Sequence, residues 1–248
     1  MQEQVLTIAQ IEKIFAANRE QTAAQVAQGV SDLPETLRPA YERALAYAPG
    51  QVEKVRQRLA ADRSTLSVLV KATQDENLPR ETRMAWLREL TERLNQIAEP
   101  LSACMTSHCS HCCYTPVTIT RIEAQLIGKA IGVTPESPPS QADVARQTES
   151  AAASRPGMGH TYDWPCPFLA TEPSLPPGKG GKCSIYEHRP MVCRSCLSMA
   201  PSDKLCELQP DHLVPIPLFD ARVPHLLAAQ IGEMDVADIR DFFPRGLS

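Results

Sequence analysis

The cysteines of this chain are confined to one part of the sequence, and this confinement constrains the fold more than any other feature. All nine lie between Cys104 and Cys206, and residues 1–103 contain none. Cysteines that merely fill an apolar core would be scattered along the chain. The part after residue 103 is therefore predicted to depend on its thiols in a way that the first 103 residues do not.

Disulfides and metal binding are the two ways in which clustered cysteines can hold a fold. The N-terminal sequence MQEQVLTIAQIEKIF has neither the basic start nor the apolar core of a signal peptide. We therefore expect a cytoplasmic protein, in which thiols stay reduced. An odd number of cysteines would also leave one thiol unpaired in a disulfide framework. Clustered thiols in a reducing compartment are more often metal ligands, so the pattern favours metal binding.

Charge and composition argue against two classes of partner. The 248 residues include 25 Lys+Arg and 29 Asp+Glu, a net charge of −4, and neither half of the chain is basic. Nucleic-acid-binding domains usually carry a basic excess or stripe, so we expect no nucleic-acid partner. No apolar run approaches the ~20 residues of a membrane-spanning helix, so we expect no membrane partner either.

The N-terminal part has the apolar periodicity of helices. We predict a helical bundle or helical hairpins over residues 1–100, with a protein partner, if there is one, bound through these helices. The expected helical segments are 8–29, 35–48 with its end at Pro49-Gly50, 51–73 with Val52, Val55 and Leu69 buried, and 79–100 with Trp86, Leu87 and Leu90 buried. The charged residues of the last segment, Arg88 and Glu92 among them, are expected on a solvated face.

The part after residue 100 is rich in Pro, Gly and Cys, and helical patterns are few. A capping box of Thr120 and Glu123 predicts a helix that begins there and ends at Gly132. Further helices are expected over the segments 140–154, 223–232 and 236–243. The stretch 155–182 is expected to form neither sheet nor helix and to be held in place by a metal.

These patterns define the predicted fold class and domains. The chain is predicted to be mainly α, with an N-terminal helical bundle or hairpins followed by a loop-rich cysteine-cluster domain that binds metal. The expected division is a helical region over 1–100, a metal-chelating domain over 101–210 and a helical C-terminal tail over 211–248. Metal is expected to be needed for folding only in the part after residue 100.

The spacing of the cysteines suits metal ligation. In the run Cys109-Ser-His-Cys112-Cys113, a C-x-x-C step lets two thiolates reach one ion from a tight turn. The adjacent thiols of Cys112 and Cys113 can share an ion only if the backbone bends sharply between them. A second C-x-x-C step joins Cys193 and Cys196. Thiolates are soft donors that suit zinc, iron–sulfur clusters and Cu(I).

Several blocks of this sequence resemble the YkgJ-type cysteine-cluster proteins, the CxxCxxCC family described as a zinc- or iron-chelating domain. The blocks are, in chain order, Cys109-x-x-Cys112-Cys113, Pro116-Val-Thr-Ile-Thr120 leading into Glu123, Cys166-Pro-Phe-Leu169, and Cys183-Ser-Ile-Tyr186-Glu-His-Arg189-Pro190-Met-Val-Cys193-Arg194. The resemblance implies that the metal ligands are Cys109, Cys112, Cys113, Cys166, Cys183 and Cys193. It does not cover the N-terminal helices.

The sequence departs from the family pattern at two cysteine positions. The family usually has a cysteine two or three residues before Cys109, whereas this chain has Thr106-Ser107-His108 in that region and its nearest cysteine at Cys104. Cys104 and His108 are the two candidates for that position. Either could supply the missing ligand, and we favour Cys104. Cys196 stands where the family commonly has an aromatic residue, and it is either an extra ligand or a packed thiol. The full set of candidate ligands is Cys104, Cys109, Cys112, Cys113, Cys166, Cys183, Cys193 and Cys196.

The remaining polar residues of this part are assigned smaller roles. Cys206 is expected to be a buried apolar residue, and His108 and His111 are expected to be exposed loop residues rather than ligands. Arg189 and Arg194 either stabilise nearby thiolates or form surface ion pairs.

Two classes of function remain open at this stage. The first is a metal-binding protein without chemistry of its own, in which zinc or an iron centre holds the loops or is carried as cargo. The second is an iron–sulfur enzyme, because flagellin lysine methylase is similar to this family in its cysteine block. Six or more thiolates exceed the four that one zinc ion or one cubane cluster needs, so there are either two centres or spare thiols.

Overall fold

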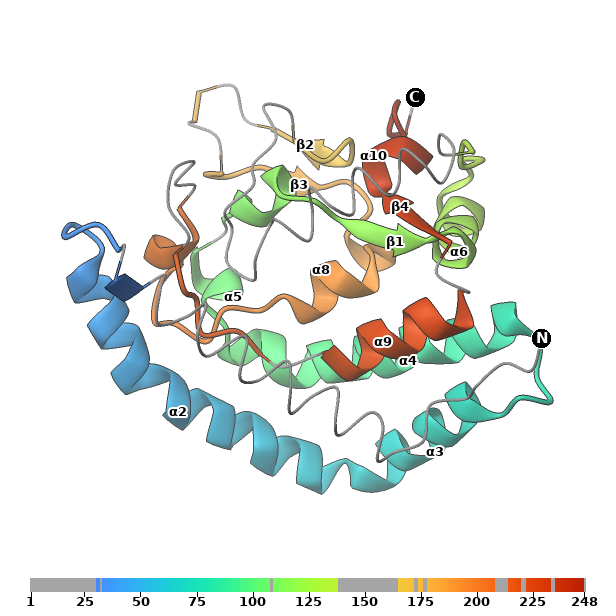
Figure 1. Ribbon diagram of the computed structural model, residues 1–248, viewed down its shortest axis with the longest axis horizontal. Helices are drawn as coiled ribbons and strands as arrows, with labels where there is room; N and C mark the ends of the chain where they lie inside the picture. Colours follow the sequence, from blue (N-terminus) through green and yellow to red (C-terminus); the bar gives the residue numbers. More distant parts are fainter. Residues whose placement is uncertain are drawn as a thin grey trace.

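The structure is a computed structural model that describes most of the chain after residue 29 (Figure 1). The described residues are 30–31, 33–107, 109–137, 165–171, 174–175, 178–207, 214–219, 222–232 and 235–247. The predicted helices over 8–29 and 140–154, and the candidate ligand His108, lie outside them. Within the described part the fold is mainly α with two small sheets, as the sequence predicts. None of the described helices is long and apolar enough to cross a bilayer.

The longest of the described helices is α2 (Arg38–Ala61), and it continues through the predicted stop at Pro49-Gly50. That prediction was wrong. Proline removes the N–H that would bond the carbonyl of Leu45 four residues earlier. Pro49 is exposed and Leu45 is 53% exposed, so water can bond the freed carbonyl. A proline on the solvent side of a long helix therefore does not end it.

The helix predicted over 51–73 is broken at Asp62, which separates α2 from α3 (Arg63–Gln74). The Asp62 carboxylate accepts a hydrogen bond from Arg93 Nε at 2.6 Å, which ties the bend to the following helix. Beyond the bend, Leu69 packs into an apolar cluster as predicted. Before it, Val52 is 49% exposed and was wrongly predicted to be buried.

The central helix of the fold is α4 (Arg80–Ala98), which begins after Pro79 as predicted and continues into a 3-10 turn, η1 (Glu99–Leu101). It packs against α3 on one side and against α8 (Met191–Ser195) and α9 (Arg222–Ile231) on the other (Figure 1). Leu87 and Leu90 are buried as predicted, but Trp86 is 40% exposed.

The described part of the chain after α4 consists of short elements. They are α5 (Ala103–Ser107), η2 (His111–Tyr114), β1 (Thr118–Thr120), α6 (Arg121–Ile131), β2 (Leu169–Ala170), β3 (Lys182–Cys183), η3 (Tyr186–His188), α8, η4 (Asp203–Cys206), α9, β4 (Val236–Asp238) and α10 (Ile239–Phe242). The ends of α6 follow the prediction, because Thr120 Oγ1 accepts from Glu123 N at 3.1 Å and Gly132 ends the helix at φ 74°. Helix α9 coincides with the segment predicted over 223–232.

Two antiparallel strand pairs correct the sequence analysis. The first pairs β1 with β4, so the segment predicted as a helix over 236–243 is half strand. The Asp238 carboxylate favours this change of structure, since Oδ2 accepts from Val117 N at 2.8 Å and Oδ1 caps α10 through Arg240 N at 2.9 Å. The second pairs β2 with β3, inside the stretch predicted to form no sheet.

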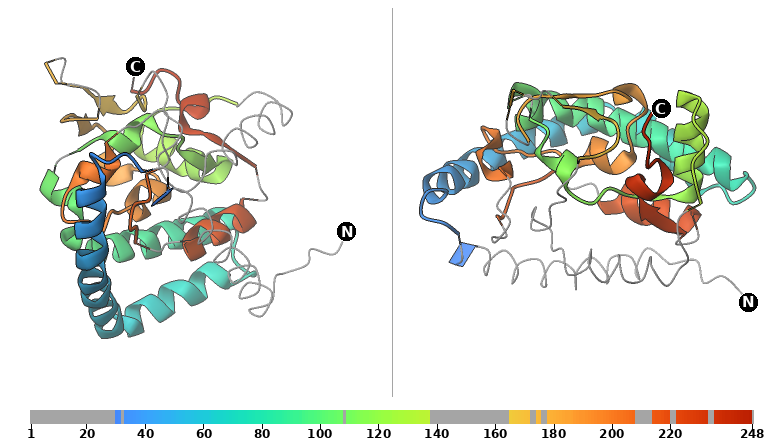
Figure 2. Two further views of the ribbon diagram at one scale, coloured as in Figure 1. Left: turned by 60° about the vertical axis from the view of Figure 1, so that its left-hand side comes forward. Right: turned by 90° about the horizontal axis from the view of Figure 1, so that it is seen from above.

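The buried apolar residues form four clusters, and three of them combine residues from before and after residue 100. Those three are Tyr41 with Leu205 and Val214, Leu87 with Met191 and Ile231, and Val55 with Leu197 and Met199. The left view of Figure 2 shows α4 between α3 and the cysteine-rich part. The three-part division of the chain stays a prediction, but the N-terminal helices and the cysteine-rich part share apolar surface.

Candidate metal centre

Backbone contacts bring the separate cysteine segments of the sequence together. Cys166 N donates to Cys113 O at 2.7 Å, which joins the first cysteine block to the loop that precedes β2. Cys183 pairs with Leu169 across the β2–β3 ladder. All nine cysteines are free thiols, and none is in a disulfide.

The turn η2 provides the sharp bend that Cys112 and Cys113 need in order to act together. In this 3-10 turn the Cys113 thiol hydrogen-bonds the Cys112 sulfur. This bond stabilises the Cys112 thiolate and lowers its pKa. The same bond, together with burial, raises the pKa of Cys113. The adjacent thiols therefore point to one place rather than diverging.

Cys112 is the electrostatic centre of the cysteine group. Burial is the main cause of the raised pKa at nearly every other cysteine, and a charge on Cys112 raises the pKa further. The cysteines affected by Cys112 are Cys104, Cys109, Cys113, Cys183, Cys193, Cys196 and Cys206. The pKa of Cys166 is raised to about 11, mainly by burial and to a smaller extent by the charge of Cys183. Because such interactions weaken with distance, the thiols affected by Cys112 are close enough to it for its charge to act on them.

The thiols occupy the boundary between two apolar clusters. Cys166, Cys183 and Cys193 pack against the cluster that contains Phe168 and Ile127. Cys104 packs against a second cluster, which contains Leu197 and Met199. Its helix α5 is held there by a hydrogen bond from Ala103 N to Ser198 O at 2.8 Å. Cys112 and Cys196 are exposed, whereas Cys206 is buried as predicted.

Two arginines act on the thiols. The positive charge of Arg189 favours the thiolates of Cys112, Cys183 and Cys193, opposing the burial that raises the pKa of the last two. Arg240 acts in the same direction on Cys166, and its Nη2 donates to Cys113 O at 2.8 Å. These guanidinium groups would offset part of the negative charge of a thiolate-bound metal.

Arg189 also forms an ion pair, but this pair is largely buried rather than the surface pair considered in the sequence analysis. Its Nη2 lies 2.6 Å from Glu99 Oε1, and its guanidinium lies over the Tyr186 ring at 4.1 Å. Arg194 is held differently, since it pairs with Glu92 and donates to Glu187 O at 2.5 Å. Burial lowers the pKa of Arg194 to about 10.

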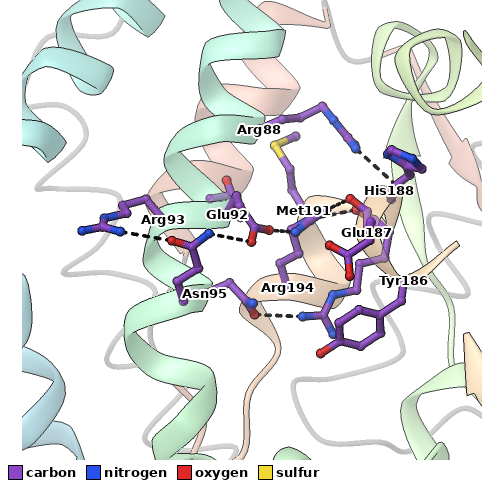
Figure 3. Close-up of polar contacts among 12 residues, drawn as sticks. Arg88, Glu92, Arg93, Asn95, Tyr186, Glu187, His188, Met191 and Arg194 are labelled. Carbon is purple, nitrogen blue, oxygen red and sulfur yellow. Dashed lines mark hydrogen bonds and ion pairs between the residues drawn. The ribbon is translucent and has the colours of Figure 1, made fainter. Parts of the chain in front are cut away.

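A row of polar side chains along α4 holds the segment that carries Cys193 (Figure 3). Its members are Arg88, Glu92, Asn95 and Glu99, spaced three or four residues apart and therefore on one face of the helix. Arg88 Nη2 donates to His188 O at 3.2 Å, and Asn95 Oδ1 accepts from Arg189 Nη2 at 3.2 Å. The prediction of a solvated face was wrong for Arg88 and Glu92, which face η3 and α8 instead.

Glu123 of α6 completes this arrangement from the other side. Its Oε1 accepts from Arg88 Nη1 at 3.0 Å and from Met191 N at 2.8 Å, and the residue is 3% exposed. The same carboxylate thereby joins α4, α6 and the first residue of α8. The capping box located Glu123 in the sequence, but its carboxylate binds other elements rather than its own helix end.

A mixed group of Cys109, His111 and Asp203 was missed by the sequence analysis. Donor atoms of these three residues all lie within 4.8 Å of one another. The expectation that His111 is exposed was wrong, because it is 2% exposed. Only the position of His111 between thiols marked it in the sequence. Asp203 follows Cys109 by more than ninety residues, and no motif in the sequence points to it.

Comparison with known families agrees with the cysteine arrangement. Residues 103–211 match the model of the CxxCxxCC family, described as a "Putative zinc- or iron-chelating domain". The resemblance stated from the sequence is thereby confirmed for this segment, which makes up less than half of the chain. Residues 1–102 lie outside the match. No curated protein and no solved structure matches the chain.

Proposed function

We propose that this protein binds zinc or an iron centre through thiolates of its cysteine cluster. The proposed ligands are drawn from Cys104, Cys109, Cys112, Cys113, Cys166, Cys183, Cys193 and Cys196. The proposal is supported chiefly by the match of residues 103–211 to a metal-chelating family, together with free thiols from separate segments whose charges interact with Cys112, Arg189 or Arg240.

The donor set fits such a metal on chemical grounds. Soft thiolates select zinc and iron–sulfur centres, and a zinc ion with four thiolates carries a net charge of −2. Nearby cations lower the energy of that charge, and Arg189 and Arg240 are in place to do so. Free thiols also agree with a reducing compartment, and we propose the cytoplasm.

The bound metal would cross-link loops that have little regular structure. The residues of the chain itself position the ligands: η2 directs Cys112 and Cys113 to one place, and α4 fixes the segment with Cys193 through the ion pair between Arg189 and Glu99. A protein partner bound through the N-terminal helices remains part of the proposal. Leu45, Tyr47 and Val52 support it, because they leave apolar surface exposed on α2.

Metal content per polypeptide, measured on protein purified without oxygen, tests this function. The full chain should contain zinc or iron in stoichiometric amount, and the double variant Cys112→Ser with Cys113→Ser should lose the metal held by the thiolate cluster. The matched control is Cys206→Ala, which removes a buried thiol outside the proposed ligand set and should keep the metal. A colourless zinc protein and a brown iron–sulfur protein are told apart by the visible absorption spectrum. A metal-free full chain would refute the proposal.

A further inference from the structure

The mixed group of Cys109, His111 and Asp203 is built by contacts between distant segments. Cys109 pairs with Lys179 in an isolated antiparallel bridge, and Ser110 N donates to Gly178 O at 2.9 Å. These bonds fix the start of η2, which carries His111. Asp203 comes from η4, which follows Gly178 and Lys179 in the sequence. The side chains therefore meet because the fold places them together.

The distance between His111 and Asp203 suits a shared metal better than a hydrogen bond. His111 Nε2 and Asp203 Oδ2 are 3.4 Å apart, whereas N–H···O bonds are commonly about 2.9–3.0 Å. A tetrahedral zinc ion with bonds of about 2.0–2.1 Å holds nitrogen and oxygen ligands roughly 3.3–3.4 Å apart. The Cys109 sulfur lies within 4.8 Å of a ring nitrogen of His111 and of a carboxylate oxygen of Asp203. Small movements would bring all three donors to the edge lengths of such a tetrahedron.

The His111 ring is held by packing on its Nδ1 side, which leaves Nε2 available to bind a metal ion. Gly178 packs against the Nδ1 side, where a Cβ on that glycine would lie 2.1 Å from Nδ1. Nδ1 is buried and has no hydrogen-bond partner among the described residues. The other nitrogen, Nε2, faces Asp203. The ring is therefore fixed by packing, and its orientation needs no further bond.

A lysine balances the Asp203 carboxylate in the structure. Lys179 Nζ lies 2.8 Å from Asp203 Oδ2 and also 3.3 Å from Glu207 Oε1. Glu207 would continue to pair with Lys179 when Asp203 binds a metal ion. Because Lys179 has two acidic partners, Asp203 can bind a metal ion while the Lys179 ammonium group stays paired with Glu207.

We propose that Cys109 Sγ, His111 Nε2 and the Asp203 carboxylate form a second metal site, suited to Zn²⁺ and separate from the thiolate cluster. One thiolate, one imidazole and one carboxylate are all zinc ligands, whereas iron–sulfur clusters are usually held by thiolates. Three protein ligands leave the fourth position of zinc for a water molecule or another small ligand. This site rests on the proposed function in one respect, because it takes Cys109 out of the thiolate set. It also accounts for part of the excess of candidate ligands over the four that one centre needs.

The test compares zinc content and cobalt spectra of full-length variants loaded with each metal. Asp203→Asn keeps the shape of the side chain and should lower the bound zinc by one equivalent per polypeptide. The cobalt–thiolate absorption of the remaining cluster should persist in that variant. The matched control is Glu207→Gln, which removes the other acid beside Lys179 and should leave the zinc content unchanged. Asp203→Glu restores the carboxylate and should recover part of the lost equivalent.

The outcomes separate this site from the proposed function. Equal zinc content in the unmodified chain and in Asp203→Asn would overturn the second site and leave the thiolate cluster standing. In the Cys112→Ser with Cys113→Ser variant the second site should still bind one zinc ion. Loss of all metal in that double variant, while it stays folded by circular dichroism, would also overturn a separate second site. If Asp203→Asn fails to fold, His111→Gln provides the same comparison, with one equivalent lost as the expected result.

Discussion

Replacing Glu123 with alanine should be among the most destabilising single substitutions outside the thiol group. The side chains of Glu123 and Arg88 are only 4% and 15% exposed, so their ion pair is shielded from water. Among the described residues, alanine would leave His188 O as the remaining hydrogen-bond partner of the Arg88 guanidinium, and it would remove the acceptor of Met191 N. Breaking a buried ion pair by removing one member costs about 3–5 kcal/mol. At about 2–4 °C per kcal/mol for a chain of this size, the melting temperature should fall by roughly 6–20 °C.

The variant Glu123→Gln separates the two contributions. Burial raises the pKa of the Glu123 carboxyl, although Arg88 and the bond from Met191 N oppose this, so the fold already disfavours the charged form. Glutamine is neutral, and its carbonyl oxygen can still accept from Met191 N. We therefore expect Glu123→Gln to cost about 1–2 kcal/mol, the scale of a weakened hydrogen bond to a charged group.

Urea denaturation of the metal-loaded protein, followed by circular dichroism, measures both costs as changes in the free energy of unfolding. Glu42→Ala is the control, because Glu42 is an exposed residue on α2 and surface changes usually stay within about 0.5 kcal/mol. The reasoning would be refuted if Glu123→Ala cost no more than this control, or if glutamine were as harmful as alanine. A double-mutant cycle with Arg88→Met should show a coupling energy well above the error of the measurement.

Three further outcomes are expected. Chelation should loosen α2–α4 as well as the loops, seen as a loss of helical circular dichroism, because the apolar clusters are shared; an intact helical signal would contradict this. Burial alone would raise the pKa of Glu99, but the hydrogen bonds from Tyr186 and Arg189 outweigh burial and lower it. The charged Glu99 carboxylate therefore stabilises the fold above its ordinary pKa of 4.5, and this contribution should be lost as pH falls through the lowered pKa. Below pH 4.5, urea midpoints should therefore fall less steeply with falling pH in Glu99→Gln than in the unmodified chain, and an unchanged pH profile would count against the reasoning. Gly178→Ala should lower the melting temperature, because φ is 83° and the new Cβ would overlap His111, whereas Gly50→Ala, with open space around its Cα, is the control that should not.

Local sequence signals predicted the elements whose ends depend on their own residues. Pro79 marks the start of α4, and Thr120 with Gly132 marks both ends of α6, since a cap is formed by side chains and backbone a few residues apart. The confinement of the cysteines, together with the order of their blocks, also predicted the metal-chelating class of the segment matched by the family model.

Features set by distant residues could not be predicted in the same way. Pro49 fails to end α2 because its position faces solvent, and exposure is decided by the tertiary packing of the helix. Val236–Asp238 becomes a strand because β1 offers it a partner more than a hundred residues earlier. The meeting of His111 with Asp203 likewise follows from the packing of η4 beside η2. The spacing of residues along a single helix or strand does not indicate contacts between residues so far apart in the sequence.

The polar row on α4 gives the N-terminal helices a role that the family resemblance does not cover. One face of α4 buries Leu87 with Met191, so it carries part of the core around α8. The adjacent face holds Arg189 through Asn95 and Glu99, and Arg189 in turn favours the thiolate of Cys193. A change in the position of α4 would therefore move both the helix that carries Cys193 and the cation beside it. For this reason we expect a partner that binds the N-terminal helices to alter the affinity of the thiolate cluster for its metal, and the metal to alter the affinity for that partner by the same factor.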